Sequence, residues 1–211
     1  MTFSDKRMPT GSELSVLKNA RIVLGQEVIT GHVALANGVI VSVDTGAAPQ
    51  AGDDLEGDYL LPGLVDIHTD HFEKHVFPRA HVRWDPLRAA MAHDTQIIGS
   101  GITTVFDALR VGMDEDADLG YSDMRALADA IETGQRENRL RADHFIHLRC
   151  EVSAPDVLSA FKVFEDDDSI RLISLMDHTP GQRQFVSMDA YKIYYQGKKG
   201  FTDAQMDDFI R

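Results

Sequence analysis

The sequence contains a single cysteine, Cys150, among its 211 residues. One cysteine excludes an intramolecular disulfide and a cysteine-based zinc site, and it agrees with a reducing compartment. Any metal ion in this protein must therefore be held by histidine, aspartate or glutamate side chains.

Long apolar runs are also absent. No stretch of 18 apolar residues occurs, and the first ten residues lack the apolar segment of a secretion signal. We therefore expect a cytoplasmic protein with no membrane partner.

Positively charged residues are fewer than negatively charged ones. The chain has 21 Lys and Arg against 34 Asp and Glu, which gives a formal net charge of -13. This balance argues against non-specific nucleic-acid binding, because no basic stripe can replace phosphate counterions. An anionic small molecule can still be bound where basic residues converge.

The first part of the chain is made of short apolar runs separated by turn signals. Asn37-Gly38 stands between two such runs, and this pair favours a two-residue hairpin turn because both positions need a positive φ. We predict a small β-sheet domain over residues 1–57, with residues 46–54 as a linker by composition.

After Pro62 the pattern changes to strands that alternate with helical stretches of about a dozen residues, which is typical of parallel βαβ units. The expected strands cover residues 64–67, 102–109, 145–150 and 171–176. A helix is expected to begin at Asp85-Pro86, and others near residues 122, 155, 187 and 202.

Four such strands are half of an eight-stranded barrel. We therefore predict an α/β fold in which residues 58–211 form the N-terminal part of a (β/α)8 TIM-like barrel, preceded by the small β-sheet domain. Half a barrel leaves two open edges. The favoured interpretation is a fragment of a longer protein whose C-terminal segment also completes the small domain; a homo-oligomer in which two copies complement each other is the alternative.

The segment His68-Thr69-Asp70 directly follows the first strand of this series. On an extended backbone residues i and i+2 point to the same side, so the imidazole and the carboxylate can bind one cation, and Zn²⁺ or Mn²⁺ accepts both ligand types. Its position adds weight, because active sites of parallel barrels are built at the carboxyl ends of strands. We predict that His68 and Asp70 are metal ligands; a surface histidine beside an aspartate is the alternative.

Two later strands also end in titratable residues. Glu151 closes the third, and His178 follows the fourth. Both are candidates for the same site, although Glu151 could instead be a carboxylate at a helix N-terminus and His178 a turn residue. His147 is interpreted as a histidine of the core or one that supports the ligands.

Basic residues surround these strand ends, and we predict that they contact an anionic substrate. Arginine presents a planar fork that suits phosphate oxygens, and lysine acts as a point charge. The candidates are Lys74, Arg79, Arg83, Arg149 and Arg183. Ordinary surface side chains are the alternative for each of them.

Six motifs occur in order along the chain, in residues 68–70, 77–79, 91–94, 100–105, 147–151 and 174–185. Together with the small β-domain they resemble the amidohydrolase superfamily. Within it they are similar to the family of α-D-ribose 1-methylphosphonate 5-triphosphate diphosphatases of the carbon–phosphorus lyase pathway.

This resemblance implies hydrolysis of a ribose 5-triphosphate that releases pyrophosphate and leaves the 5-phosphate, in phosphonate catabolism. It implies one or two divalent ions (Zn, Mn or Mg) held by His68, Asp70, Glu151 and His178, with Glu151 as the bridging carboxylate. A further histidine and the aspartate that orients the attacking water are expected beyond Arg211.

Two other functions remain open from the sequence. The same metal-binding strand end serves C–N cleavage on this fold, so a cyclic-amide hydrolase or deacetylase is one alternative. A metal-free scaffold with structural histidines is the other. Neutralising Arg79 and Arg183 should impair a diphosphatase more than an amidase, because a triphosphate needs several converging cations.

Overall fold

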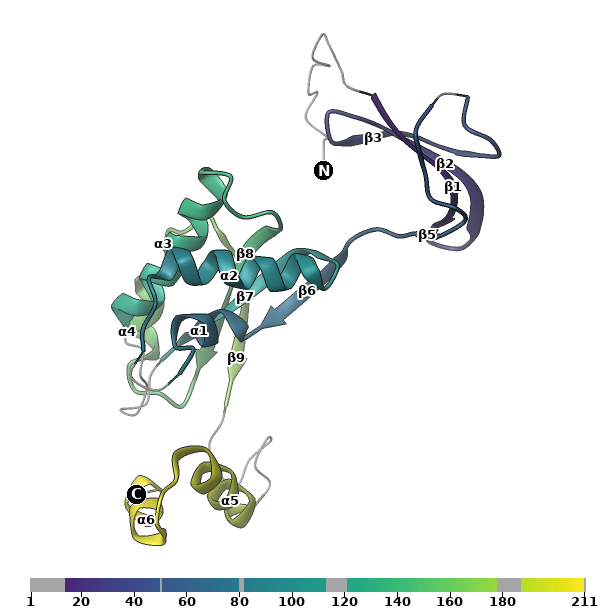
Figure 1. The fold of residues 1–211 in the computed structure, drawn as a ribbon. Coiled ribbons are helices and arrows are strands. Elements are labelled where there is room, and N and C mark those ends of the chain that lie inside the picture. The colour runs from purple at the N-terminus through teal and green to yellow at the C-terminus, as the bar shows by residue number, and fades with distance from the viewer. Residues whose placement is uncertain (1–13, 50, 80–81, 113–120, 178–186, 211) are drawn as a thin grey trace. The chain divides into compact units, whose positions relative to one another are not determined.

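The structure, a computed structural model, describes residues 14–49, 51–79, 82–112, 121–177 and 187–210 (Figure 1). The chain divides into two compact units, Met1–Pro62 and Gly63–Arg211. Among the described residues, no helix is long and apolar enough to cross a membrane.

The smaller unit is one sheet with the strand order β3-β2-β1-β4, in which β5 also pairs with β1. Its strands are β1 (Leu14–Val23), β2 (Val28–Ala36), β3 (Val39–Thr45), β4 (Asp53–Asp54) and β5 (Tyr59–Leu60). Asn37 and Gly38 connect β2 to β3 with φ values of 54° and 76°, as the hairpin signal predicted. The linker prediction was wrong at its end, because Asp53 and Asp54 pair with β1.

The larger unit is built on four parallel strands in the order β6-β7-β8-β9. The strands are β6 (Leu64–Thr69), β7 (Ile102–Val111), β8 (Asp143–Glu151) and β9 (Ile170–Met176). Sequential order with helical crossovers is the arrangement of the first half of a (β/α)8 barrel, so the predicted α/β fold class is confirmed.

Six helices are described in this unit: α1 (His71–Val76), α2 (Pro86–Gly99), α3 (Tyr121–Arg136), α4 (Val157–Lys162), α5 (Met188–Lys199) and α6 (Asp203–Ile210). Asp85 caps α2, since its side chain accepts the backbone N–H of Arg88, and Gly101 with φ 80° follows its end. The helices expected near residues 85, 122, 155, 187 and 202 correspond to α2 to α6, whereas α1 was not expected.

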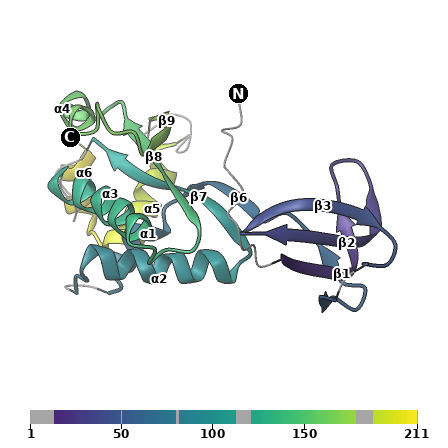
Figure 2. The same cartoon turned by 90° about the horizontal axis from the view of Figure 1, so that it is seen from above.

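The main core lies between the sheet and the helices that cover one of its faces (Figures 1 and 2). Alternate residues of the central strands point into it, including Leu109 of β7 and Ile146 and Leu148 of β8. Because side chains alternate along a strand, the residues between them face the opposite side of the sheet, which we call the inner face.

The edge strands carry apolar side chains that are more than a third exposed. These are Leu64, Val65 and Ile67 in β6 and Ile173 and Leu175 in β9. Exposed aliphatic side chains on both outermost strands agree with the open edges expected of a half-barrel.

Candidate functional site

The predicted metal ligands His68 and Asp70 lie at the carboxyl end of β6. The pairing of β6 with β7 shifts register between Asp66 and Thr69, and the Asp66 Oδ1 atom accepts the backbone N–H of His68 at 3.0 Å. Thr69 is buried, which leaves its two neighbours on the inner face. The local bulge therefore presents the imidazole and the carboxylate on one side of the strand.

The distance between these side chains suits a shared cation. His68 Nε2 lies 3.3 Å from Asp70 Oδ1. Two ligand atoms about 2.1 Å from one tetrahedral ion are about 3.4 Å apart. His68 and Asp70 thus fit two positions around a single ion such as Zn²⁺.

Two side chains of β8 approach this pair from the inner face. Arg149 Nη1 donates to Asp70 Oδ1 at 2.5 Å. Arg149, which was predicted to contact the substrate, therefore forms an ion pair with Asp70, which was predicted to bind the metal ion. The His147 ring meets the His68 ring edge to face, with centroids 4.9 Å apart. Burial and the neighbouring His68 lower the pKa of His147.

His147 connects three strands. Its Nδ1 atom lies 3.2 Å from the Ile67 carbonyl oxygen of β6, and its Nε2 atom lies 2.9 Å from Ser174 Oγ of β9. A carbonyl oxygen only accepts, so Nδ1 donates to it and Nε2 accepts from the serine hydroxyl. This agrees with the interpretation of His147 as a supporting histidine.

The remaining predicted site residues are in different situations. The Glu151 Oε1 atom accepts from Ser153 Oγ at 2.8 Å at the end of β8. Arg83 forms an ion pair with Asp123 of α3 and lies over the Phe77 ring.

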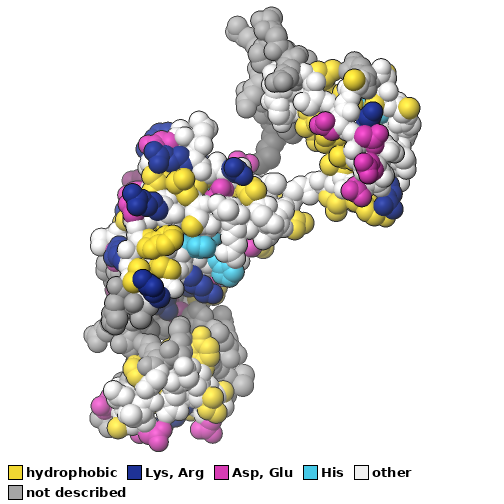
Figure 3. All heavy atoms as spheres, in the orientation of Figure 1, with side chains coloured by type: hydrophobic (Ala, Val, Ile, Leu, Met, Phe, Trp, Pro, Cys, Tyr) yellow, Lys and Arg dark blue, Asp and Glu magenta, His cyan; other side chains and the backbone are white. Residues whose placement is uncertain are grey.

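Lys74 and Arg79 are exposed. In Figure 3 histidine side chains gather beside lysine or arginine side chains on the surface of the larger unit. His178 and Arg183 lie outside the described residues. The full set of ligands and substrate contacts stays a prediction.

One charged residue near Asp70, Glu73, was not expected from the sequence to belong to the site. Glu73 of α1 has a buried Oε1 atom without a hydrogen-bond partner in the described part of the chain. Burial raises the pKa of Glu73, against the opposing charges of Arg149 and Arg110. Glu73 stands three residues after Asp70, but its place was not evident because no helix was expected there.

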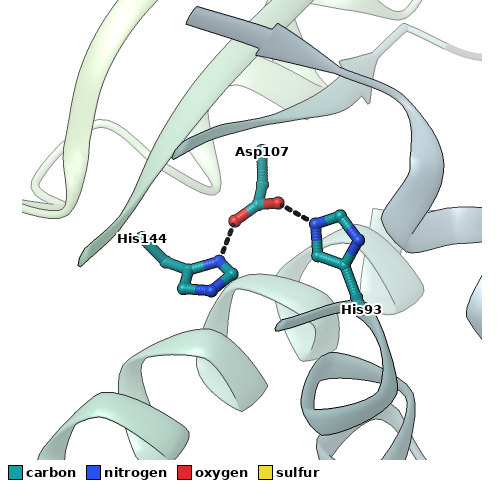
Figure 4. Close-up of side chains that lie close together, drawn as sticks. All are labelled: His93, Asp107 and His144. Atoms are coloured by element: carbon teal, nitrogen blue, oxygen red, sulfur yellow. Dashed lines mark hydrogen bonds and ion pairs between the residues drawn. The ribbon is translucent and has the colours of Figure 1, made fainter. Parts of the chain in front are cut away.

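A second group of titratable side chains lies on the other face of the sheet, inside the core (Figure 4). Asp107 of β7 stands between two imidazoles: its Oδ1 is 2.7 Å from His93 Nε2 of α2, and its Oδ2 is 2.7 Å from His144 Nδ1 of β8. His144 Nε2 lies 3.2 Å from Asp94 Oδ1, which also accepts two backbone N–H groups. We call these four residues the buried histidine network.

The nitrogen–oxygen distances in the buried histidine network indicate hydrogen bonds and not ligation of a metal ion. His93, Asp107 and His144 form a donor set that could in principle hold a metal ion. At 2.7 Å, however, each nitrogen–oxygen distance is that of a hydrogen bond and is shorter than the separation of about 3.4 Å between ligands of a tetrahedral ion. Both ring nitrogens of His144 face carboxylate oxygens, so both carry protons and the ring is an imidazolium.

The charge of His144 predicts how stability depends on pH. Burial alone would lower the pKa of His144, but the hydrogen bonds and charges of Asp107 and Asp94 outweigh it and raise the pKa above 6.5. A raised pKa in the folded state means that this stabilisation is fully present below about pH 6.5 and is lost as the pH rises through the folded-state pKa.

Replacing His144 by glutamine should therefore flatten the decline of the unfolding free energy above about pH 6.5. Urea denaturation of the wild type and His144→Gln across this range measures the difference. The comparison cancels the other histidines, which are common to both proteins. An equally steep decline in the variant would contradict the charged state of His144.

No family model matches the chain. It is 39% identical over 196 residues to the alpha-D-ribose 1-methylphosphonate 5-triphosphate diphosphatase of Escherichia coli (strain K12). The chain is a relative of this enzyme. The match covers 92% of the chain and 52% of the enzyme, so the chain spans about half the length of the relative that it matches, and the resemblance indicated by the motifs is confirmed.

Solved structures of hydantoinases are also similar to the chain. A D-hydantoinase shares 18% identity, with 90% of this chain and 44% of that chain covered and a TM-score of 0.44. The L-hydantoinase (dihydropyrimidinase) of Arthrobacter aurescens shares 17% identity over 88% of this chain and 38% of that chain, with a TM-score of 0.45. These likenesses are weak, and the relationship rests on the sequence match.

Proposed function

We propose that this chain belongs to a metal-dependent hydrolase that releases pyrophosphate from α-D-ribose 1-methylphosphonate 5-triphosphate and leaves the 5-phosphate. The observation that carries the proposal is the His68–Asp70 pair, whose facing atoms are 3.3 Å apart at the carboxyl end of the first barrel strand. The 39% identity to a diphosphatase supports this substrate. Glu151 and His178 are proposed as further ligands.

The side chains of the chain have separable tasks in this reaction. His68 and Asp70 would hold the ion, and His147 would keep the His68 ring in place through the edge-to-face contact. When bound, a divalent ion makes hydroxide available near neutral pH, because it lowers the pKa of water from about 15.7 to about 7. Arg149 neutralises Asp70 and offers its remaining N–H groups to phosphate oxygens.

Metal removal tests the proposal on the full-length protein. Treatment with a chelator should abolish pyrophosphate release from the sugar triphosphate, and Zn²⁺ or Mn²⁺ should restore it. In a parallel assay, dihydrouracil, a cyclic amide, is tested as the alternative substrate. Pyrophosphate release that persists without metal would refute the metal-dependent mechanism, and cleavage of the cyclic amide alone would refute the substrate.

A further inference from the structure

The peptide bond between Ile67 and His68 lies in the bulge near the end of β6. In the described pairing of β6 with β7, neither residue has a register partner, because the register shifts between Asp66 and Thr69. The N–H and the C=O of this peptide therefore need partners outside the ladder. The peptide directly precedes the His68 Cα atom, so its orientation decides where the His68 imidazole points.

Side chains hold both polar groups of this peptide. The His68 N–H donates to Asp66 Oδ1 at 3.0 Å. The Ile67 carbonyl oxygen accepts from His147 Nδ1 at 3.2 Å. Because a peptide unit is planar, it cannot turn without breaking at least one of these two hydrogen bonds. The bulge that presents His68 is thus held from both sides.

His147 reaches the Ile67 carbonyl from two strands away. The strand β7 lies between β8 and β6 in the sheet, and the register partner of His147 on β7 is Ala108. Register partners on parallel strands share a face, so the imidazole passes over the Ala108 methyl group, which is buried. A larger side chain at this position would block the ring, because protein interiors leave no spare space.

Ser174 of β9 holds the other nitrogen of the His147 ring. Its Oγ atom lies 2.9 Å from His147 Nε2, which accepts from the hydroxyl because Nδ1 carries the ring proton. Each ring nitrogen therefore has one partner, and the two partners are on the two edge strands of the sheet. Without the Ser174 hydroxyl, the imidazole could turn about its χ2 torsion and lose the Ile67 carbonyl, since this torsion is only weakly restricted.

We propose that Ser174 is a positioning residue of the metal site, which acts through His147 on the Ile67–His68 peptide and so aims the His68 imidazole. The inference rests on the proposed function, because it concerns the ion that His68 would bind. Groups that orient a metal ligand contribute about 10- to 100-fold to metal affinity. Ser174 acts through one further residue, so removal of its hydroxyl should weaken metal binding by about 10-fold.

The Zn²⁺ affinity of the full-length protein tests this role without requiring catalysis. Competition with a chromophoric chelator measures the affinity of two variants that have the same shape, Ser174→Thr and Ser174→Val. Both add the same methyl group to β9, but only threonine keeps the hydroxyl. Ser174→Val should bind Zn²⁺ about 10-fold more weakly than Ser174→Thr. Ser174→Ala, compared with the wild type, measures the same loss without an added methyl group.

A double-mutant cycle separates positioning from a general structural role. His147→Phe keeps an aromatic ring but cannot donate to the Ile67 carbonyl, and it should weaken Zn²⁺ binding by about 10- to 100-fold. In the His147→Phe protein, Ser174→Ala should cause no further loss, because its effect passes through His147. Ser159→Ala, which removes an exposed hydroxyl of α4, is the matched control and should bind Zn²⁺ like the wild type.

Two results would overturn the positioning role. The first is an equal Zn²⁺ affinity of folded Ser174→Thr and Ser174→Val. The second is a loss of affinity from Ser174→Ala that is as large in the His147→Phe protein as in the wild type, because Ser174 would then act independently of His147.

These outcomes are distinct from failure of the proposed function. If the Ser174 variants lose Zn²⁺ affinity as expected while the wild type releases no pyrophosphate, the positioning role stands and the hydrolysis falls. If metal-dependent hydrolysis is present while Ser174→Thr and Ser174→Val bind Zn²⁺ equally, the positioning role falls and the hydrolysis stands. A wild type that binds no metal ion contradicts both.

Discussion

Asp107→Leu is expected to lower the free energy of unfolding by about 3 to 5 kcal/mol, the range found when one partner of a buried charge pair is removed. Asp107 accepts hydrogen bonds from both His93 and His144 in a region that is closed to solvent. Without it, the His144 imidazolium keeps only the 3.2 Å contact to Asp94, and His93 loses its hydrogen-bond partner.

Urea denaturation followed by circular dichroism measures this loss. Asp143→Leu, at the exposed first residue of β8, is the matched control and should change the unfolding free energy by less than about 0.5 kcal/mol. A loss below about 1 kcal/mol in Asp107→Leu would mean that the network contributes little and that its charges are solvated in solution.

The second large effect is expected from His68→Ala in the full-length protein. Loss of a side chain that merely orients a metal ligand typically costs 10- to 100-fold in affinity or activity, so removal of a ligand itself should lower pyrophosphate release by more than about 100-fold. Elemental analysis of the purified variant should show less bound metal than in the wild type.

His71→Ala is the control for this experiment, because His71 is an exposed histidine three residues later whose Nδ1 atom lies 3.4 Å from Gln96 Nε2 of α2. It should retain both metal and activity. Normal metal content in His68→Ala would remove His68 from the ligand set and with it the central assignment of the candidate site.

The fold was predictable wherever the sequence carries a local signal. Asn37-Gly38 predicted the hairpin because its two positive φ values are properties of those residues. Asp85-Pro86 marked the start of α2 in the same way. α1 was missed because its six residues are too few to show a periodic apolar pattern and no proline marks its start, whereas Pro155 precedes the equally short α4.

The candidate site was predictable in part. The i, i+2 rule correctly placed His68 and Asp70 on one side, although the pairing of β6 with β7 shifts register just before them. The buried histidine network escaped notice because His93 and His144 approach Asp107 from positions 14 and 37 residues away. One signal was present: Asp107 lies on the same face of its strand as Val105 and Leu109, and an aspartate on an apolar face must find a partner in the core.

The imidazolium of His144 also offers a spectroscopic signature. Its two ring N–H protons are each directed at a carboxylate oxygen and are shielded from solvent. The proton on Nδ1 lies in a short, charged hydrogen bond of 2.7 Å to Asp107 and is therefore deshielded, and burial slows its exchange with water because it is released only when the core opens. Proton NMR should therefore show a sharp resonance far downfield of the backbone amides, and this resonance should disappear when the sheet unfolds.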